Sequence, residues 1–321
     1  MNAKRVGVKV APIYFVLVLF IVLNLSLVVF SCDSSKKINL EVEGIPPVLN
    51  EEQQTLFDTY FQRLKEFPNI RSDSTSNTSL GWEYDQTVPE LADFVVTHNL
   101  RDVMGDGTEI ERFIYLMEWV HEKTYSEKEL GNPDTLNSLA ILNYITTQKR
   151  AVNCRMKSIV LNEILLSLGY CSRRLSCKPS LFDGDSHAIV TVYSNEMDKW
   201  ICLDPTFNTF FHDGEGNVLS YVEIRNAYTN GEIPAFRAIP LTPTGSLMLS
   251  GIAFETYDQW YAVYMAKNCF KASCPQHSKF GYEDSEGLTY VYLLPKGYVA
   301  EDLGNDAIFT YNSRDFFKKP L

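Results

Sequence analysis

Residues 153–169 read NCRMKSIVLNEILLSLG, which places a cysteine and two cations ahead of a long apolar stretch. On a helix over residues 154–168 almost no polar face remains, because the apolar side chains are Met156, Ile159, Val160, Leu161, Ile164, Leu165, Leu166 and Leu168. A helix that is apolar all round belongs inside a domain. Gly169 is well placed to end it. The sequence therefore predicts a buried helix that begins at Cys154.

The pattern after Gly169 changes to alternation with a period of two. Residues 172–177, 188–193 and 200–203 read as strands, and residues 195–198, Asn-Glu-Met-Asp, supply a turn between the last two. A short turn between two strands joins them into a hairpin. An antiparallel sheet is therefore expected downstream of the buried helix.

Helices are expected upstream of it. A capping residue followed by Glu or Gln three positions later marks helix starts at Asn50 with Gln53, Thr87 with Glu90, Thr108 with Glu111 and, further on, Ser220 with Glu223. Another helical stretch follows Pro133. Strand-like runs at 246–254, 260–270, 288–294 and 308–311 suggest that the sheet continues toward the C-terminus. The expected fold class is α+β.

The chain divides into five expected parts. They are a signal peptide at 1–31, a tether at 32–49, an N-terminal helical region at 50–107, a core at 108–235 and a C-terminal β-rich extension of the core at 236–321.

The N-terminus predicts export. Lys4, Arg5 and Lys9 precede an apolar run over residues 10–30, as in a signal peptide. Ser31 and Cys32 follow, which resembles a bacterial lipobox in which Cys32 is lipidated and becomes the first mature residue. The alternative is an uncleaved signal anchor, because the run approaches the length that spans a bilayer. On the first interpretation a lipid anchor holds the domain at the bacterial cell envelope, outside the cytoplasm.

Composition argues against a disordered chain and against a protein that binds nucleic acid. With 321 residues, 45% of them hydrophobic, the chain is long and apolar enough to form a real core. Its net charge of -11 repels phosphate backbones, so nucleic acid is not an expected partner.

Cys269 and Cys274 are a candidate disulfide pair. Together with His277 they invite a zinc reading, but their spacing matches no familiar four-ligand pattern. No metal or organic cofactor is predicted.

Three residues have the chemistry of a cysteine nucleophile and its partners. Cys154 begins the buried helix, where the helix dipole favours a thiolate. His187 heads one strand of the predicted hairpin, and Asp204 ends the other. In that hairpin residue 187 is expected to pair roughly with residue 204, which makes imidazole and carboxylate neighbours.

These motifs resemble the transglutaminase-like superfamily, which shares the papain-like arrangement of a cysteine at a helix start packed on an antiparallel sheet. The matching stretches are 153–158, 168–170, 186–188 and 199–206, with an upstream helix that contains Trp119. The resemblance covers residues 108–231. It implies a catalytic triad of Cys154, His187 and Asp204.

The resemblance also implies a reaction. Cys154 attacks a carbonyl of a peptide or protein amide, His187 moves the proton, and Asp204 orients the imidazole. The resulting thioester reacts with water in a protease or amidase, or with an amine in a transamidase, and the triad does not choose between them. The alternative is a catalytically inactive envelope lipoprotein that uses the fold for binding or assembly.

Each residue also has a simpler interpretation. Cys154 by itself reads as a core thiol, His187 as a histidine at a strand end and Asp204 as part of an Asp-Pro turn. Arg155 and Lys157 either stabilise the thiolate and bind an acidic substrate, or are solvated charges at a helix start.

Overall fold

The computed structural model describes residues 44–320 except 45, 71, 73–79, 127, 181–184, 300–302 and 304–306. The described residues belong to one compact unit, Asn39–Leu321. The expected signal peptide and the lipidation site Cys32 lie outside the described residues. Within the described part, no helix is both long enough and apolar enough to cross a membrane.

A six-stranded sheet forms the centre of this unit, with the strand order β10-β9-β7-β2-β3-β4. Its strands are β2 (Ser172–Lys178), β3 (His187–Ser194), β4 (Lys199–Leu203), β7 (Lys271–Pro275), β9 (Tyr290–Leu293) and β10 (Ile308–Thr310). Neighbouring strands are antiparallel except β9 and β10, which are parallel. The expected α+β class with a mostly antiparallel sheet is therefore observed.

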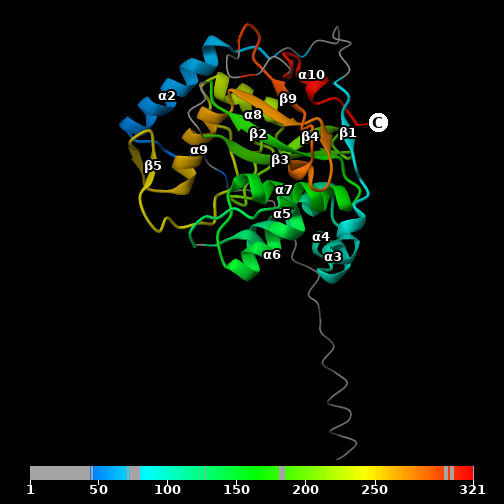
Figure 1. Cartoon of the computed structure of the whole chain (residues 1–321). Coiled ribbons are helices and arrows are strands. Elements are labelled where there is room, and N and C mark those ends of the chain that lie inside the picture. The colour runs from blue at the N-terminus through cyan, green and yellow to red at the C-terminus, as the bar shows by residue number, and fades with distance from the viewer. Residues whose placement is uncertain are drawn as a thin grey trace, which may run out of the picture. The chain divides into compact units, whose positions relative to one another are not determined.

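The helix that begins at Cys154 packs on one face of this sheet. It is α7 (Cys154–Ser167), and it contacts β2 and β3. Asn153 caps its start by accepting a hydrogen bond from the Met156 N–H at 3.2 Å. Ser158 Oγ donates to the Ala188 carbonyl at 2.8 Å, which fixes the start of α7 against the start of β3. The helices α5 (Glu109–Thr124) and α6 (Ser138–Gln148) cover α7, and Figure 1 shows the three together on one side of the strands.

Three other helices share a hydrophobic core with the opposite face of the sheet. They are α2 (Glu51–Glu66), α8 (Tyr221–Thr229) and α9 (Tyr257–Asn268). Their buried side chains form one cluster with Leu175, Cys177 and Ile189, which project from β2 and β3. The sheet is thus buried on both faces, in agreement with a β3 that has no exposed residue.

Short elements complete the described part. They are β1 (Glu83–Tyr84) paired with β8 (His277–Ser278), the hairpin β5 (Leu247–Leu249) and β6 (Ile252–Phe254), the 3-10 helices η1 (Pro89–Leu91) and η2 (Tyr282–Asp284), and the helices α3 (Ala92–Thr97), α4 (Leu100–Met104) and α10 (Ser313–Phe316).

Local helix signals were accurate at three positions. Both hydrogen bonds of the capping box are present at Asn50 with Gln53, at Thr108 with Glu111 and at Ser220 with Glu223. The expected start at Thr87 is different, because η1 begins at Pro89 after Val88, which makes no side-chain cap. α2 also packs against α8 and α9, so this part of the N-terminal helical region belongs to the same compact unit as the sheet.

The expected strand over 260–270 is wrong. That segment belongs to α9, whose residues from Tyr261 to Asn268 are all buried. A fully buried helix has no polar face, so its pattern cannot be told from that of a buried strand. The following strand β7 takes a central place in the sheet. Cys269 precedes β7 by two residues and Cys274 lies within it. Both are buried free thiols, so the candidate disulfide pair is not formed.

Candidate active site

Cys154 is the first residue of α7 and is partly exposed. Its sulfur lies 4.0 Å from the Ser186 carbonyl oxygen and accepts a hydrogen bond from the Ala188 backbone. Among the described cysteines one other, Cys171, is partly exposed, and the remaining four are buried. The helix start thus presents a thiol that a substrate can reach.

His187 lies between this thiol and a carboxylate. Its Nε2 is 2.5 Å from Asp204 Oδ2, and the ring also hydrogen bonds with the Cys154 side chain. Because Nε2 serves Asp204, the other nitrogen, Nδ1, is the one available to the thiol. The structure therefore brings the three residues of the expected triad together.

The strand register differs from the expected one by two residues. Val190 pairs with Leu203 and Ser194 with Lys199, so the register extended to residue 187 leads to Thr206 and not to Asp204. A shift of two residues keeps a side chain on the same face of the sheet, and diagonal neighbours on one face lie within reach of long side chains. His187 and Asp204 meet along this diagonal.

Two further groups hold the Asp204 carboxylate. The Thr206 N–H donates to Oδ1 at 2.9 Å, and the buried Tyr261 hydroxyl of α9 donates to Oδ2 at 2.9 Å. Backbone hydrogen bonds with Thr209 in both directions close the loop that follows β4. Sequence reasoning missed Tyr261, because the segment that carries it was read as a strand.

Burial and charge act in opposite directions on the three candidate residues. Burial raises the pKa of Asp204, but the charge of His187 and the hydrogen bonds lower that pKa by more than burial raises it. The pKa of Asp204 therefore lies below its ordinary value. Burial lowers the pKa of His187, but Asp204 and Cys154 raise it well above normal. Burial also raises the pKa of Cys154, and the hydrogen bond and charge of His187 bring it below its ordinary value. The arrangement favours a thiolate, an imidazolium and a carboxylate.

Aromatic rings surround the imidazole. The ring centroid of His187 is 5.6 Å from that of Phe207 and 5.4 Å from that of Tyr264. Trp260 stacks on Tyr264 at 4.3 Å and also contacts Phe207. Phe207 and Trp260 are partly exposed, so they form an apolar surface beside the imidazole.

The two cations that follow Cys154 have different environments. Arg155 pairs with Glu283, whose side chain is only 3% exposed and also pairs with Arg174 of β2. Lys157 is buried, with 8% of its surface exposed. The interpretation as solvated charges is therefore wrong for Lys157.

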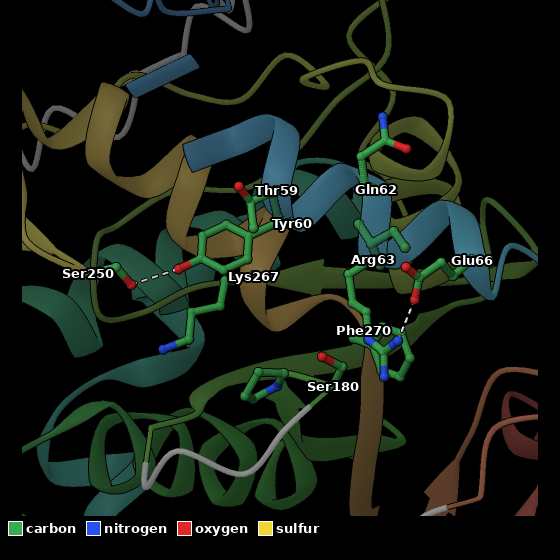
Figure 2. Close-up of a pocket in the computed structure, with 12 residues that line it drawn as sticks. Thr59, Tyr60, Gln62, Arg63, Glu66, Ser180, Ser250, Lys267 and Phe270 are labelled. Carbon is green, nitrogen blue, oxygen red and sulfur yellow. Dashed lines mark hydrogen bonds and ion pairs between the residues drawn. The ribbon is translucent and has the colours of Figure 1, made fainter. Parts of the chain in front are cut away.

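A pocket of about 520 Å³ lies between α2 and the end of α9 (Figure 2), and its lining includes Arg63, Leu64 and Phe270. Lys267, also in its wall, pairs with Asp185 at 3.0 Å. Asp185 belongs to the loop before β3 and precedes His187 by two residues. This ion pair therefore joins the wall of the pocket to that loop. Cys154 is not among the residues that line this pocket. Across the described residues, no group of three or more His, Cys, Asp and Glu side chains is placed to hold a metal ion.

No protein-family model and no curated protein sequence matches the chain. Two solved structures are similar at a low level. One is a proposed cysteine protease from Cytophaga hutchinsonii, with 14% identity and a TM-score of 0.27 over 43% of this chain. The chain spans less than half of that protein, 46% of its length. The other is LapG of Legionella pneumophila after EGTA treatment, with 13% identity and a TM-score of 0.28 over 68% of this chain and 97% of that one. Similarities at this level define no family for this chain.

Proposed function

We propose that this chain is a cysteine enzyme of transglutaminase-like type that acts on a peptide or protein amide. The observation that carries the proposal is that His187 Nε2 lies 2.5 Å from the buried Asp204 carboxylate, while the same imidazole interacts with the Cys154 side chain and lowers its pKa. A nucleophilic cysteine needs a lowered pKa, a base within reach and a group that orients the base. The three residues supply these requirements in that order.

The proposed reaction has two steps. The Cys154 thiolate attacks the amide carbonyl carbon, and the imidazolium of His187 gives its proton to the leaving amine as the carbon–nitrogen bond breaks. A thioester on Cys154 remains. In the second step His187 takes a proton from water or from an amine, which displaces the thiolate and gives a carboxylic acid or a new amide. The backbone N–H of Cys154, at the start of α7, is a suitable donor to the oxyanion that forms in each step.

The surroundings of the imidazole favour one kind of substrate. Phe207 lies next to His187, Trp260 contacts Phe207, and both rings are partly exposed. Rings of this kind bind apolar side chains by burying their surface. We therefore expect a peptide or protein substrate with an apolar side chain near the amide that reacts.

The location belongs to the same proposal. The N-terminal apolar run and Cys32 support export to the bacterial cell envelope and a lipid anchor in the membrane. Globomycin treatment of cells that express the full chain tests this, because a lipoprotein precursor then accumulates at a larger mass.

Alkylation tests the nucleophile, and Cys171 is a matched internal control. Both thiols are partly exposed, but burial raises the pKa of Cys171, whereas the pKa of Cys154 is lowered. Iodoacetamide below the ordinary thiol pKa should modify Cys154 and spare Cys171, and His187→Ala should abolish the difference. Equal modification of both thiols at alkaline pH alone would favour the inactive binding protein.

A second experiment identifies the acceptor. The protein is incubated with a peptide library, with and without a primary amine, and the products are analysed by mass spectrometry. Shorter peptides indicate hydrolysis, and peptides that carry the amine indicate transamidation. Cys154→Ala should remove either product, while Cys171→Ala should leave it.

A further inference from the structure

The two residues before His187 lie outside the sheet and beside the nucleophile. Asp185 and Ser186 precede β3, whose first ladder pair joins His187 to Cys177. The Ser186 carbonyl oxygen lies 4.0 Å from the Cys154 sulfur, where it accepts from the thiol. The position of this segment beside the nucleophile is therefore set by contacts outside the β2–β3 ladder.

Helix α9 supplies such contacts. The Tyr264 hydroxyl donates to Asp185 Oδ1 at 3.1 Å and, over a longer distance of 3.4 Å, to the Ser186 carbonyl oxygen. The Lys267 ammonium donates to the other carboxylate oxygen of Asp185 at 3.0 Å. The two donors are three residues apart and so lie on the same side of α9. These contacts of Asp185 with Tyr264 and Lys267 are referred to as the α9 anchor.

Burial strengthens the α9 anchor. The Lys267 side chain is 8% exposed, and that of Asp185 is 42% exposed. Lysine is almost never buried unless it is paired, because taking an ammonium group out of water is costly. Burial also raises the pKa of Tyr264, so its hydroxyl remains a protonated donor. The α9 anchor is therefore a stable connection between the helix and the segment before β3, at the pocket wall that Figure 2 shows.

The same helix supports the other groups of the candidate site. The Tyr264 ring lies 5.4 Å from the His187 ring, centroid to centroid. Tyr261, one turn earlier, donates to the Asp204 carboxylate at 2.9 Å. α9 thus contacts the acid, the base and the segment that borders the nucleophile. Reacting groups have to be held to within about 0.5 Å of their working geometry, and α9 is placed to do this.

We propose that Asp185 is a positioning residue: held by Tyr264 and Lys267, it keeps Ser186 and His187 in place against the Cys154 sulfur. Asp185 itself contacts no reacting atom. Without the α9 anchor the segment before β3 relaxes, the imidazolium moves away from the sulfur and the thiolate loses stabilisation. The assignment rests on the proposed triad, but its test needs no substrate.

The test is the rate at which iodoacetamide alkylates Cys154 in the full chain as a function of pH. Asp185→Ala removes both contacts of the α9 anchor, and Tyr264→Phe removes a hydroxyl but no charge. At about pH 6 we expect Asp185→Ala to react roughly tenfold more slowly, since weaker contact with one opposite charge changes an acid dissociation constant by about that factor. Tyr264→Phe should react at an intermediate rate. At alkaline pH all rates should equal that of the wild type.

The direction of the change separates positioning from a simple effect of charge. Removing the negative charge of Asp185 would by itself favour the thiolate and speed the reaction at low pH, because like charges disfavour ionisation. A slower reaction therefore identifies a loss of geometry.

Two further variants test the α9 anchor itself. Lys267→Arg keeps the ion pair and should keep the low-pH reaction. Lys199→Met is the matched control, because it removes an ion pair with Glu223 at the far end of the β3–β4 hairpin. Its profile should coincide with that of the wild type.

Three results overturn the proposal: an Asp185→Ala profile that coincides with the wild type, one that differs from it by a constant factor at every pH, and one that moves toward lower pH. If Asp185→Ala does not fold, Tyr264→Phe decides by the same criteria. If the wild type itself reacts only at alkaline pH, the proposed triad fails, and this role of Asp185 fails with it.

Discussion

Replacing Tyr261 with phenylalanine removes a single hydroxyl from the candidate triad. Tyr261 is 1% exposed, and its hydroxyl donates at 2.9 Å to the Asp204 oxygen that His187 contacts at 2.5 Å. A hydrogen bond to a charged group contributes about 1.5–3 kcal/mol to stability. We therefore expect Tyr261→Phe to lower the free energy of unfolding by about 1.5–3 kcal/mol.

The pH of the measurement follows from the two linked pKa values. Asp204 has a lowered pKa in the folded state, so its stabilising contribution is complete above the ordinary value of 3.8 and is lost as the pH falls through the folded value. His187 has a raised pKa, so its contribution is complete below 6.5 and is lost as the pH rises through the folded value. Both contributions are complete near pH 5, where Tyr261→Phe should have its full effect. The effect should shrink in acid, as Asp204 gains a proton.

Tyr228→Phe is the matched control. Tyr228 is as buried as Tyr261, and both rings pack on Phe211. Within the described residues the Tyr228 hydroxyl has no hydrogen-bond partner, so its removal should be close to neutral. Urea unfolding at several pH values measures both variants. Equal effects of the two substitutions, or a Tyr261→Phe effect that does not depend on pH, would refute the assigned role of the hydroxyl.

Three other perturbations have defined outcomes. Glu283→Gln should destabilise the fold by about 3–5 kcal/mol in urea, because Arg174 is left buried without its counter-ion; exposed Glu286→Gln should change stability by less than about 0.5 kcal/mol. Burial raises the pKa of Glu163 to about 7 from 4.5, so wild-type stability should fall as pH rises between those values, and Glu163→Gln should flatten that slope in urea titrations at several pH values. Trp260→Ala should raise KM for an apolar peptide more than it lowers kcat, and steady-state kinetics that show an equal loss in kcat would contradict a binding role.

Local signals made much of the fold predictable. A capping box depends on residues three positions apart, so the helix starts at Asn50, Thr108 and Ser220 follow from the sequence without tertiary information. The buried helix and the hairpin were predictable for the same reason, since a period of two and a short turn are local features. These elements already place a cysteine at a helix start and a histidine at a strand start.

Tertiary packing decided the elements that local patterns could not separate. α9 is buried all round and lacks the polar face that marks a helix in a sequence. Arg173 shows the same limit, because it lies fully buried between Trp82 and Trp200, with its guanidinium 4.1 and 4.0 Å from the ring centroids. In the sequence, Trp82 is more than 80 positions from Arg173 and Trp200 is about 27 positions from it. The three side chains therefore meet only because the chain folds.

The sequence by itself determined which residues are candidates for the chemistry, because residue type and strand or helix position depend on nearest neighbours. Only the tertiary structure decided how these residues work on one another. It set the two-residue diagonal between His187 and Asp204 and brought Tyr261 of α9 to that carboxylate. Distances between side chains and the loss of water around charges arise only when distant segments pack together, and pKa values follow from both.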